Sequence, residues 1–250
     1  MAKIITFANH KGGVGKTTSA VNVGAGFAKK GKKVLLIDLD AQANLTASLS
    51  PVNYDDTDER TVYEAMLERK NIPIYNVGEN LDIVPASLML SNADMQLINA
   101  ISRETILKDL ISPVKDKYDY IFIDCPPSLG IMTMNAFVAS TDIIIPLTME
   151  TLPVKGLIMM QNFLNTIKKT VNPSLNLLGI LITNYEGRKI NKAYEASVNQ
   201  QYGNLVFKTK IRKNITVTEA PAAHLSLFDY DPSCNASTDY NMLIAEISAL

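Results

Sequence analysis

Short apolar runs alternate along this chain with longer segments in which apolar residues recur every three or four positions. Runs that are apolar almost throughout and rich in Ile, Val and Leu are typical of strands buried on both faces of a sheet. They lie at residues 4–8, 33–40, 81–85, 120–124, 142–147 and 177–183. Strands that alternate with helices predict a mostly parallel, twisted sheet with helices on both faces, so the expected fold class is α/β.

The segments between these runs predict the helices. Gly31 favours a helix end before the second strand, and residues 61–64 form a capping-box pattern that opens a short helix. The acidic region 41–60 is expected to be a mobile loop, and 205–211 to form short extended segments. The helices are expected at 17–30, 61–69, 92–111, 130–139, 153–170, 191–202, 215–220 and 236–249.

The turn after the first strand is rich in Gly and Lys, and residues 9–18 are NHKGGVGKTT. Strand, glycine turn and helix in this order predict a phosphate-binding loop. The glycines allow backbone N–H groups to curl around an anion, and the helix dipole favours the same site. Lys16 is expected to reach the β- and γ-phosphates of a nucleoside triphosphate, and the Thr17 hydroxyl to ligate Mg²⁺. The nucleotide-binding residues expected here are Lys11, Gly12, Gly13, Val14, Gly15, Lys16, Thr17 and Thr18.

The loop departs from the standard template at two neighbouring positions. His10 stands where the template has Gly, and Lys11 adds a second lysine. This arrangement resembles the deviant Walker A motif of the ParA/MinD family of ATPases. The resemblance implies a P-loop NTPase fold and a homodimer that forms on ATP binding, in which Lys11 reaches the partner's nucleotide and is counted as catalytic.

Carboxylates stand at the ends of two predicted strands. Asp38 and Asp40 are two residues apart, so their side chains point to opposite faces unless the strand is turning there. Asp124 ends another apolar strand, where a carboxylate suits an indirect contact with Mg²⁺. These segments resemble the family patterns D-x-D-P-Q, with Ala41 in place of proline, and D-x-P-P-x-x-G. The resemblance implies that Asp40 is catalytic, as the residue that positions the attacking water, and that Lys16 is catalytic as well. The expected metal ligands are Thr17, Asp38 and Asp124.

Further contacts rest on resemblance as well. Glu150 lies in a segment like one that runs to the dimer interface, and Asn184 ends a strand where an amide could contact adenine. Residues 211–221 resemble the stretch I-P-R-N-x-x-x-x-E-A-P, which adds Ile211 and Lys213 to the nucleotide contacts. In partition ATPases, basic residues in two such regions bind double-stranded DNA without sequence preference. The expected DNA-binding residues are Arg188, Lys189, Lys192, Arg212 and Lys213.

Bulk composition limits the possibilities only loosely. The 250 residues suit one domain over 1–250, with 47% hydrophobic residues and a net charge of -1, so DNA binding needs a local basic patch. Cys125 and Cys234 form no CxxC pattern, which favours the cytoplasm. The sequence contains no run of 18 apolar residues, so no membrane-spanning helix is expected. No signal-peptide pattern is present.

The resemblance implies a DNA-segregation ATPase that is cytoplasmic and nucleoid-associated and slow in hydrolysis. A ParB-type centromere-binding protein is the expected partner and stimulator, and no membrane partner is expected. Alternatives are a MinD-like membrane-cycling ATPase, a relative that positions a protein assembly, an iron–sulfur reductase and a non-enzymatic regulator. The predicted last helix, from Ala236 to Leu250, contains no Lys or Arg, which argues against a basic membrane-binding helix. The two cysteines do not suggest a cluster.

Overall fold

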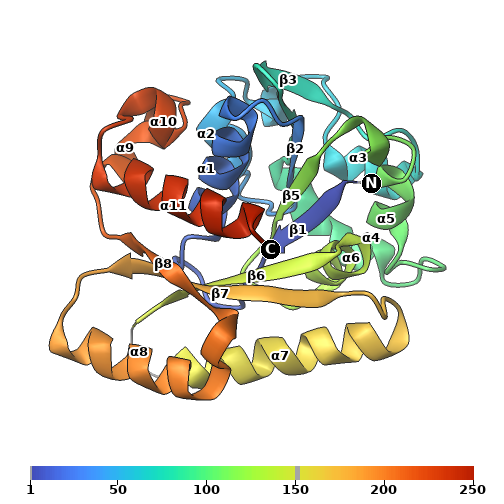
Figure 1. Cartoon of the computed structure of the whole chain (residues 1–250). Coiled ribbons are helices and arrows are strands. Elements are labelled where there is room, and N and C mark those ends of the chain that lie inside the picture. The colour runs from blue at the N-terminus through green and yellow to red at the C-terminus, as the bar shows by residue number, and fades with distance from the viewer. Residues whose placement is uncertain (1, 150–152) are drawn as a thin grey trace.

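One sheet organises the molecule, with strand order β3-β4-β2-β5-β1-β6-β7-β8 (Figure 1). The computed structural model describes residues 2–149 and 153–250. All neighbouring strands in it run parallel except β3 and β4, which form an antiparallel hairpin. The strands are β1 (Lys3–Phe7), β2 (Val34–Asp38), β3 (Tyr75–Gly78), β4 (Leu81–Val84), β5 (Tyr120–Asp124), β6 (Asp142–Thr148), β7 (Asn176–Tyr185) and β8 (Val206–Arg212). The predicted α/β class and mostly parallel sheet are confirmed.

Helices cover both faces of the sheet (Figure 1). The helices α1, α10 and α11 pack on one face, and α3, α5, α6 and α7 pack on the other. The helices are α1 (Lys16–Lys29), α2 (Asn44–Leu49), α3 (Val62–Glu68), α4 (Ala93–Leu97), α5 (Ile106–Ile111), α6 (Ile131–Ala139), α7 (Pro153–Thr170), α8 (Lys189–Tyr202), α9 (Thr216–Ala222), α10 (Leu227–Tyr230) and α11 (Asn235–Ser248). Short 3₁₀ helices lie at Tyr54–Asp56, Leu88–Asn92, Lys115–Lys117 and Gly203–Leu205. No helix in the described part of the chain is both long and apolar enough to cross a membrane.

The continuous apolar strands build two hydrophobic cores at once. In β2, Val34 and Leu36 join the core under α1 and α11, whereas Leu35 and Ile37 join the core under α3, α5 and α6. All four side chains are fully buried. Because successive side chains of a strand point to opposite faces, every position of a central strand must be apolar, which explains the pattern in the sequence.

The prediction of one long helix over residues 92–111 is wrong. The chain forms α4, a turn at 98–105 in which Ser102 has φ of 51°, and then α5. Buried Asn135 of α6 stabilises the break: its Oδ1 accepts from the N–H of Leu107 at 3.0 Å, and its Nδ2 donates to the Arg103 carbonyl at 2.8 Å. The amide therefore satisfies backbone groups that a continuous helix would have paired internally.

One further expectation needs correction, and another is refined. Residues 41–60 contain α2, whose Thr46 donates two hydrogen bonds to the buried carboxylate of Asp38, so this region is anchored to the end of β2. Residues 205–211 belong largely to β8, a seven-residue edge strand paired with β7. The hairpin strand β3 and the short helix α10 were not predicted. Helices at 61–69, 130–139, 153–170 and 236–249 are confirmed within two residues at each end.

The parallel strands bring distant polar residues to one edge of the sheet. Asp38 at the end of β2 and Phe7 at the end of β1 are both in register with Asp124 of β5. Thr148 of β6 is likewise in register with Thr183 of β7. In open α/β sheets, ligand sites lie outside the carboxyl ends of the strands, and this edge carries the glycine-rich loop.

Candidate functional site

The loop between β1 and α1 has the geometry of an anion-binding cradle. Gly13 and Gly15 have φ of 71° and 79°, in the left-handed region that glycine adopts without strain. A Cβ added to Gly12 or Gly13 would meet no atom of residues 2–149 or 153–250 within 4 Å, so this side of the backbone is open to a ligand. Gly15 is the N-cap of the 14-residue helix α1, so the positive end of the helix dipole faces the same space.

Neighbouring strands hold this loop in place. Asn9 donates from Nδ2 to the Pro146 carbonyl at 2.7 Å and accepts the N–H of Lys11 at 3.1 Å. Thr183 Oγ1 donates to the Val14 carbonyl at 2.8 Å. The loop is thereby fastened to β6 and β7 on one side of β1. The motif template does not include Asn9 or Thr183, and their supporting role was not predicted.

Lys16 and Thr17 point toward the ends of the central strands. Lys16 is 6% exposed, and its Nζ donates to the Lys11 carbonyl at 3.2 Å. Burial lowers the pKa of Lys16, while the negative charges of Asp124 and Asp40 act in the opposite direction. Thr17 Oγ1 donates to Asp124 Oδ2 at 2.6 Å. The lysine and the hydroxyl therefore both lie beside the strand-end carboxylate of Asp124.

Asp124 has the features of a carboxylate built for a cation. It is fully buried, and its Oδ1 has no hydrogen-bond partner among the described residues. Burial raises the pKa of Asp124 well above its usual value, and the nearby carboxylate of Asp38 raises it further. A divalent cation here would accept the lone pairs of the unpartnered oxygen and favour the ionised form. The donor set of a hydroxyl and carboxylates suits Mg²⁺.

The two carboxylates of the 38–40 segment occupy different environments. Asp38 is fully buried: its Oδ1 accepts from the N–H of Asp40 at 3.1 Å, and its Oδ2 accepts from the N–H and hydroxyl of Thr46 at 3.0 and 2.8 Å. Burial raises the pKa of Asp38 to about 6 against these hydrogen bonds. Asp40 is half-buried, lines the main pocket, and accepts the N–H of Gln42 at 3.0 Å. Asp40 thus faces the ligand space, whereas Asp38 lies beneath it, in register with Asp124.

A pocket of about 830 Å³ joins most of the predicted nucleotide-binding residues. It extends from the glycine loop past Asp40 to residues 211–215 and α9. Of the predicted residues it is lined by Gly12, Gly13, Val14, Gly15, Lys16, Thr17, Thr18, Asn184, Ile211 and Lys213. Lys11 is exposed, and Glu150 lies outside the described residues. The volume is within the range of small-molecule and cofactor sites.

The predicted DNA-binding residues divide into two groups. Arg188, Lys189 and Lys192 are exposed at the start of α8. Lys213 and Arg212 lie at the end of β8, where each has an acidic partner: Lys213 pairs with Glu186 at 2.9 Å, and Arg212 pairs with Asp239 of α11. The structure brings the two groups together, because β8 lies beside β7, which leads into α8.

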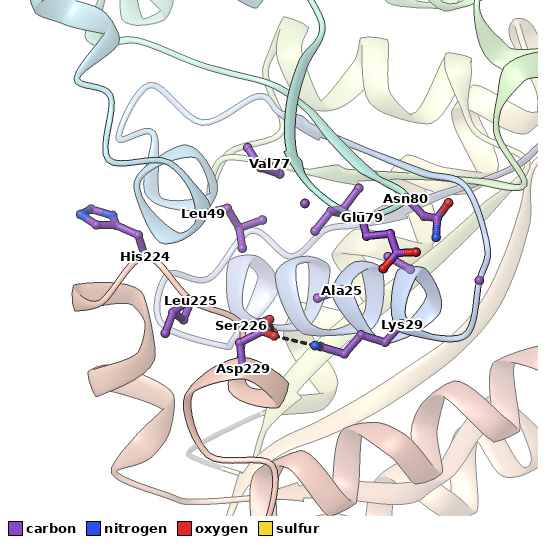
Figure 2. A pocket seen from close by; sticks show the side chains of 14 residues that line it. Ala25, Lys29, Leu49, Val77, Glu79, Asn80, His224, Leu225, Ser226 and Asp229 are labelled. Atoms are coloured by element: carbon purple, nitrogen blue, oxygen red, sulfur yellow. Dashed lines mark hydrogen bonds and ion pairs between the residues drawn. The ribbon is translucent and has the colours of Figure 1, made fainter.

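A second pocket, of about 460 Å³, lies between α1, the β3–β4 hairpin and the connection from α9 to α10 (Figure 2). Its lining contains no predicted site residue. The hairpin residues Glu79 and Asn80 form one wall, and His224 and Leu225 another. An ion pair between Lys29 and Asp229, 2.5 Å from Nζ to Oδ1, closes one end. Its lining mixes apolar and charged side chains and has no glycine cradle, so the candidate site is the larger pocket.

A parallel sheet that leads into a glycine-rich loop, with Lys16, Thr17 and Asp124 around one pocket, defines a P-loop nucleoside triphosphatase. The second lysine, Lys11, places it in the deviant Walker A class. Residues 2–177 match the family model described as an AAA domain. The chain is 39% identical over 253 residues to the sporulation initiation inhibitor protein Soj of Bacillus subtilis, covering 100% of this chain and 99% of that one. It belongs to the Soj/ParA family of partition ATPases, which confirms the family expected from the motifs.

Solved structures support the same fold. One is the cobyrinic acid a,c-diamide synthase of Mycobacterium smegmatis with bound ATP analogue and magnesium, with a TM-score of 0.87, 29% identity, and coverage of 98% of this chain and 93% of that one. Another is a protein of Borrelia burgdorferi B31 assigned to plasmid partition and bound to AMPPNP, with a TM-score of 0.84, 29% identity, and coverage of 100% and 99%.

Proposed function

We propose that this protein is an ATP- and Mg²⁺-dependent partition ATPase whose ATP-bound dimer binds DNA without sequence preference and is released by hydrolysis. The observation that carries the proposal is a single loop with two lysines: Lys16 lines the pocket together with Thr17 and Asp40, and Lys11 is exposed in the same loop. One lysine suffices to neutralise phosphates within a subunit, so a second at the mouth supports a site completed by another copy.

The chain's own groups account for nucleotide binding. The backbone N–H groups of residues 12–18 and the Lys16 ammonium would bind the phosphates. Thr17 and Asp124, with Asp38 behind them, would hold Mg²⁺, which supplies charge neutralisation to phosphoryl transfer. ATP and magnesium are supported by the AMPPNP in the Borrelia protein and by the ATP analogue and magnesium in the Mycobacterium protein.

Hydrolysis would depend on Asp40. Phosphoryl transfer needs a positioned water and compensated charge more than a strong base, and a half-buried carboxylate facing the pocket can orient the water. Lys11 from a second copy would contribute the remaining positive charge. A ParB-type partner would accelerate this slow step. Glu150, Asn184, Ile211 and Lys213 remain proposed contacts to the nucleotide.

DNA binding would use the surface formed by Arg188, Lys189, Lys192 and Lys213, which the structure brings together at the β7–α8 connection and the end of β8. Contacts of this kind go to phosphates and carry no sequence information, so binding weakens steeply as salt rises. Arg212 would act indirectly, by holding the end of β8 against α11. In a cell, the ATP-bound dimer would then be cytoplasmic and associated with the nucleoid.

Two variants test the nucleotide cycle. Lys16→Ala should abolish ATP-dependent dimerisation, measured by light scattering, whereas Asp40→Ala should still dimerise with ATP but fail to release phosphate. The exposed carboxylate of Asp58, in the connection between β2 and α3, supplies the control: Asp58→Ala should behave like the wild type. Normal phosphate release by Asp40→Ala would disprove its assigned role.

A titration of duplex DNA with ADP and with ATP, at several salt concentrations, tests the output. Binding should require ATP, should be independent of sequence, and should weaken by one to two orders of magnitude from low to moderate salt. Arg188→Ala should weaken it further. ATP-dependent binding to liposomes in place of DNA would favour the MinD-like alternative and contradict the proposal.

A further inference from the structure

One carboxylate holds two of the cations in the proposed DNA-binding surface. Glu186 lies in the connection between β7 and α8, and its Oε2 is 2.9 Å from Nη2 of Arg188. Its Oε1 accepts from Nζ of Lys213, also at 2.9 Å. Lys213 lies 27 positions further along the chain, just after β8. Two segments that are distant in sequence therefore meet at a single acidic side chain.

The backbone fixes this arrangement. The N–H of Lys213 donates to the Tyr185 carbonyl at 3.2 Å, which places Lys213 next to the residue preceding Glu186. Gly187 has φ of 70° and turns the chain so that Arg188 returns toward the carboxylate. The N–H of Arg188 donates to Asn191 Oδ1 at 3.2 Å and is held at the start of α8. The hydrogen bond from Lys213, with the positive charges of Arg188 and Lys213, lowers the pKa of Glu186, so the carboxylate is ionised at neutral pH.

The neighbouring cations are held differently. Lys210 pairs with Glu195 of α8, whose side chain is 17% exposed, and its ammonium lies 4.6 Å from the centre of the Tyr185 ring. Arg212 is bound through several hydrogen bonds to Asp239, whose side chain is 6% exposed. Arg188 and Lys213 are 69% and 61% exposed, against 29% for Lys210 and 45% for Arg212, and the Glu186 side chain is 26% exposed, so the pairs with Glu186 are the more solvated ones and are weak. These two cations can therefore exchange partners at little cost.

A carboxylate that presents one oxygen to each of two cations has the same form as the two non-bridging oxygens of a phosphodiester. We propose that Arg188 and Lys213 together form a binding site for one DNA backbone phosphate, and that Glu186 occupies this site in the DNA-free protein. DNA binding exchanges the carboxylate for the phosphate, so Glu186 sets how tightly the surface holds DNA. This inference rests on the proposed DNA-binding function, and it adds the position of one phosphate and the residue that competes for it.

The test removes the competing charge and keeps its shape. Glu186→Gln should tighten ATP-dependent binding to duplex DNA by about three- to tenfold, because the phosphate no longer displaces an anion. The slope of log affinity against log salt should become steeper by up to about one. The matched control is Glu195→Gln, which makes the same change of charge in α8 beside Lys210 and should have an effect less than half as large on the logarithmic scale. Thermal melting of both variants verifies that they remain folded.

The outcomes separate this inference from the proposed function. Equal tightening in both variants would be a general effect of net charge and would overturn the phosphate site while leaving DNA binding intact. Unchanged DNA affinity in Glu186→Gln would likewise overturn the phosphate site and leave the proposed DNA binding intact. Binding by Glu186→Gln under conditions in which the wild type does not bind would support the inference in its strongest form. Absence of DNA binding in the wild type and in both variants would refute the proposed function and the phosphate site with it.

Discussion

Replacing Arg212 would separate a structural role from a role in DNA binding. Its Nε and Nη2 donate to both oxygens of Asp239 over 2.6–3.1 Å, and its backbone N–H donates to the same carboxylate at 2.9 Å. Nη2 also reaches the Asn235 carbonyl at 3.3 Å. These contacts connect the end of β8 to the start of α11, so we expect Arg212 to act mainly on stability.

The size of the effect follows from the burial of the partner. Removing one member of a buried ion pair costs about 3–5 kcal/mol, whereas fully exposed pairs contribute under about 1 kcal/mol. The Asp239 side chain is 6% exposed but that of Arg212 is 45% exposed, and the backbone N–H survives any substitution. We therefore expect Arg212→Ala to cost about 2 kcal/mol, between these limits. Arg212→Lys keeps the charge but not the planar fork, so it should lose about half of this or more.

Urea denaturation of the two variants measures the loss, and DNA titration with ATP measures binding at the same salt concentrations. Combining Arg212→Ala with Asp239→Asn should cost less than the sum of the single variants, since no buried carboxylate is then left unpaired. The structural assignment would fail if Arg212→Lys had wild-type DNA binding while Arg212→Ala lost DNA binding at unchanged stability. That result would place the Arg212 charge on the DNA.

Three further predictions address the site and its supports. Burial raises the pKa of Asp38 to about 6, which means that the folded protein binds the proton of this carboxyl more tightly than the unfolded chain does. The resulting stabilisation is complete below about pH 4 and is lost as pH rises through about 6. Urea denaturation without Mg²⁺ would measure the free energy of unfolding of the wild type minus that of Asp38→Asn, which should fall by up to about 3 kcal/mol over that range. A difference that does not change with pH would contradict the prediction. A Cβ at Gly156 would lie 2.6 Å from Cε1 of His10, so Gly156→Ala should displace His10 and with it the glycine-rich loop. We expect ATP binding to weaken about tenfold in a fluorescent-nucleotide assay, and to recover when His10→Gly is added. A Cβ at Gly26 would lie 2.2 Å from Cδ1 of Ile244, so Gly26→Ala should destabilise by about 1–3 kcal/mol despite its better helix propensity, and a raised melting temperature would refute the close packing.

The sequence predicted the features that depend on neighbouring residues. The nearly continuous apolar positions of β2 and β5 require burial on both faces, and together with the alternation of strands and helices they predict a parallel sheet covered by helices. The glycine loop is equally local, because Gly13 and Gly15 adopt backbone angles that few other residues adopt. Lys16, Thr17 and Asp124, which the motifs singled out, lie beside one another in the structure, since parallel strands end at one edge.

The features that were missed depend on specific side-chain contacts that the folded chain brings about. The expected helix at 92–111 is interrupted because Asn135 offers its backbone other partners, and α2 forms where Thr46 can bond to Asp38. A periodic pattern cannot reveal such competition, because the free energy of a helix depends on what packs against it.

The basic residues of the last third show the same division. The resemblance to the partition ATPases makes Arg188, Arg212 and Lys213 candidates for DNA binding, with Arg188 and Lys213 first. The folded chain gives the physical difference between them: Arg212 pairs with the buried Asp239, whereas Arg188 and Lys213 share Glu186, whose side chain is 26% exposed. The sequence by itself determined where positive charge occurs, and the tertiary structure decided which charges can be exchanged, because the strength of an ion pair depends on the burial and geometry of its partner.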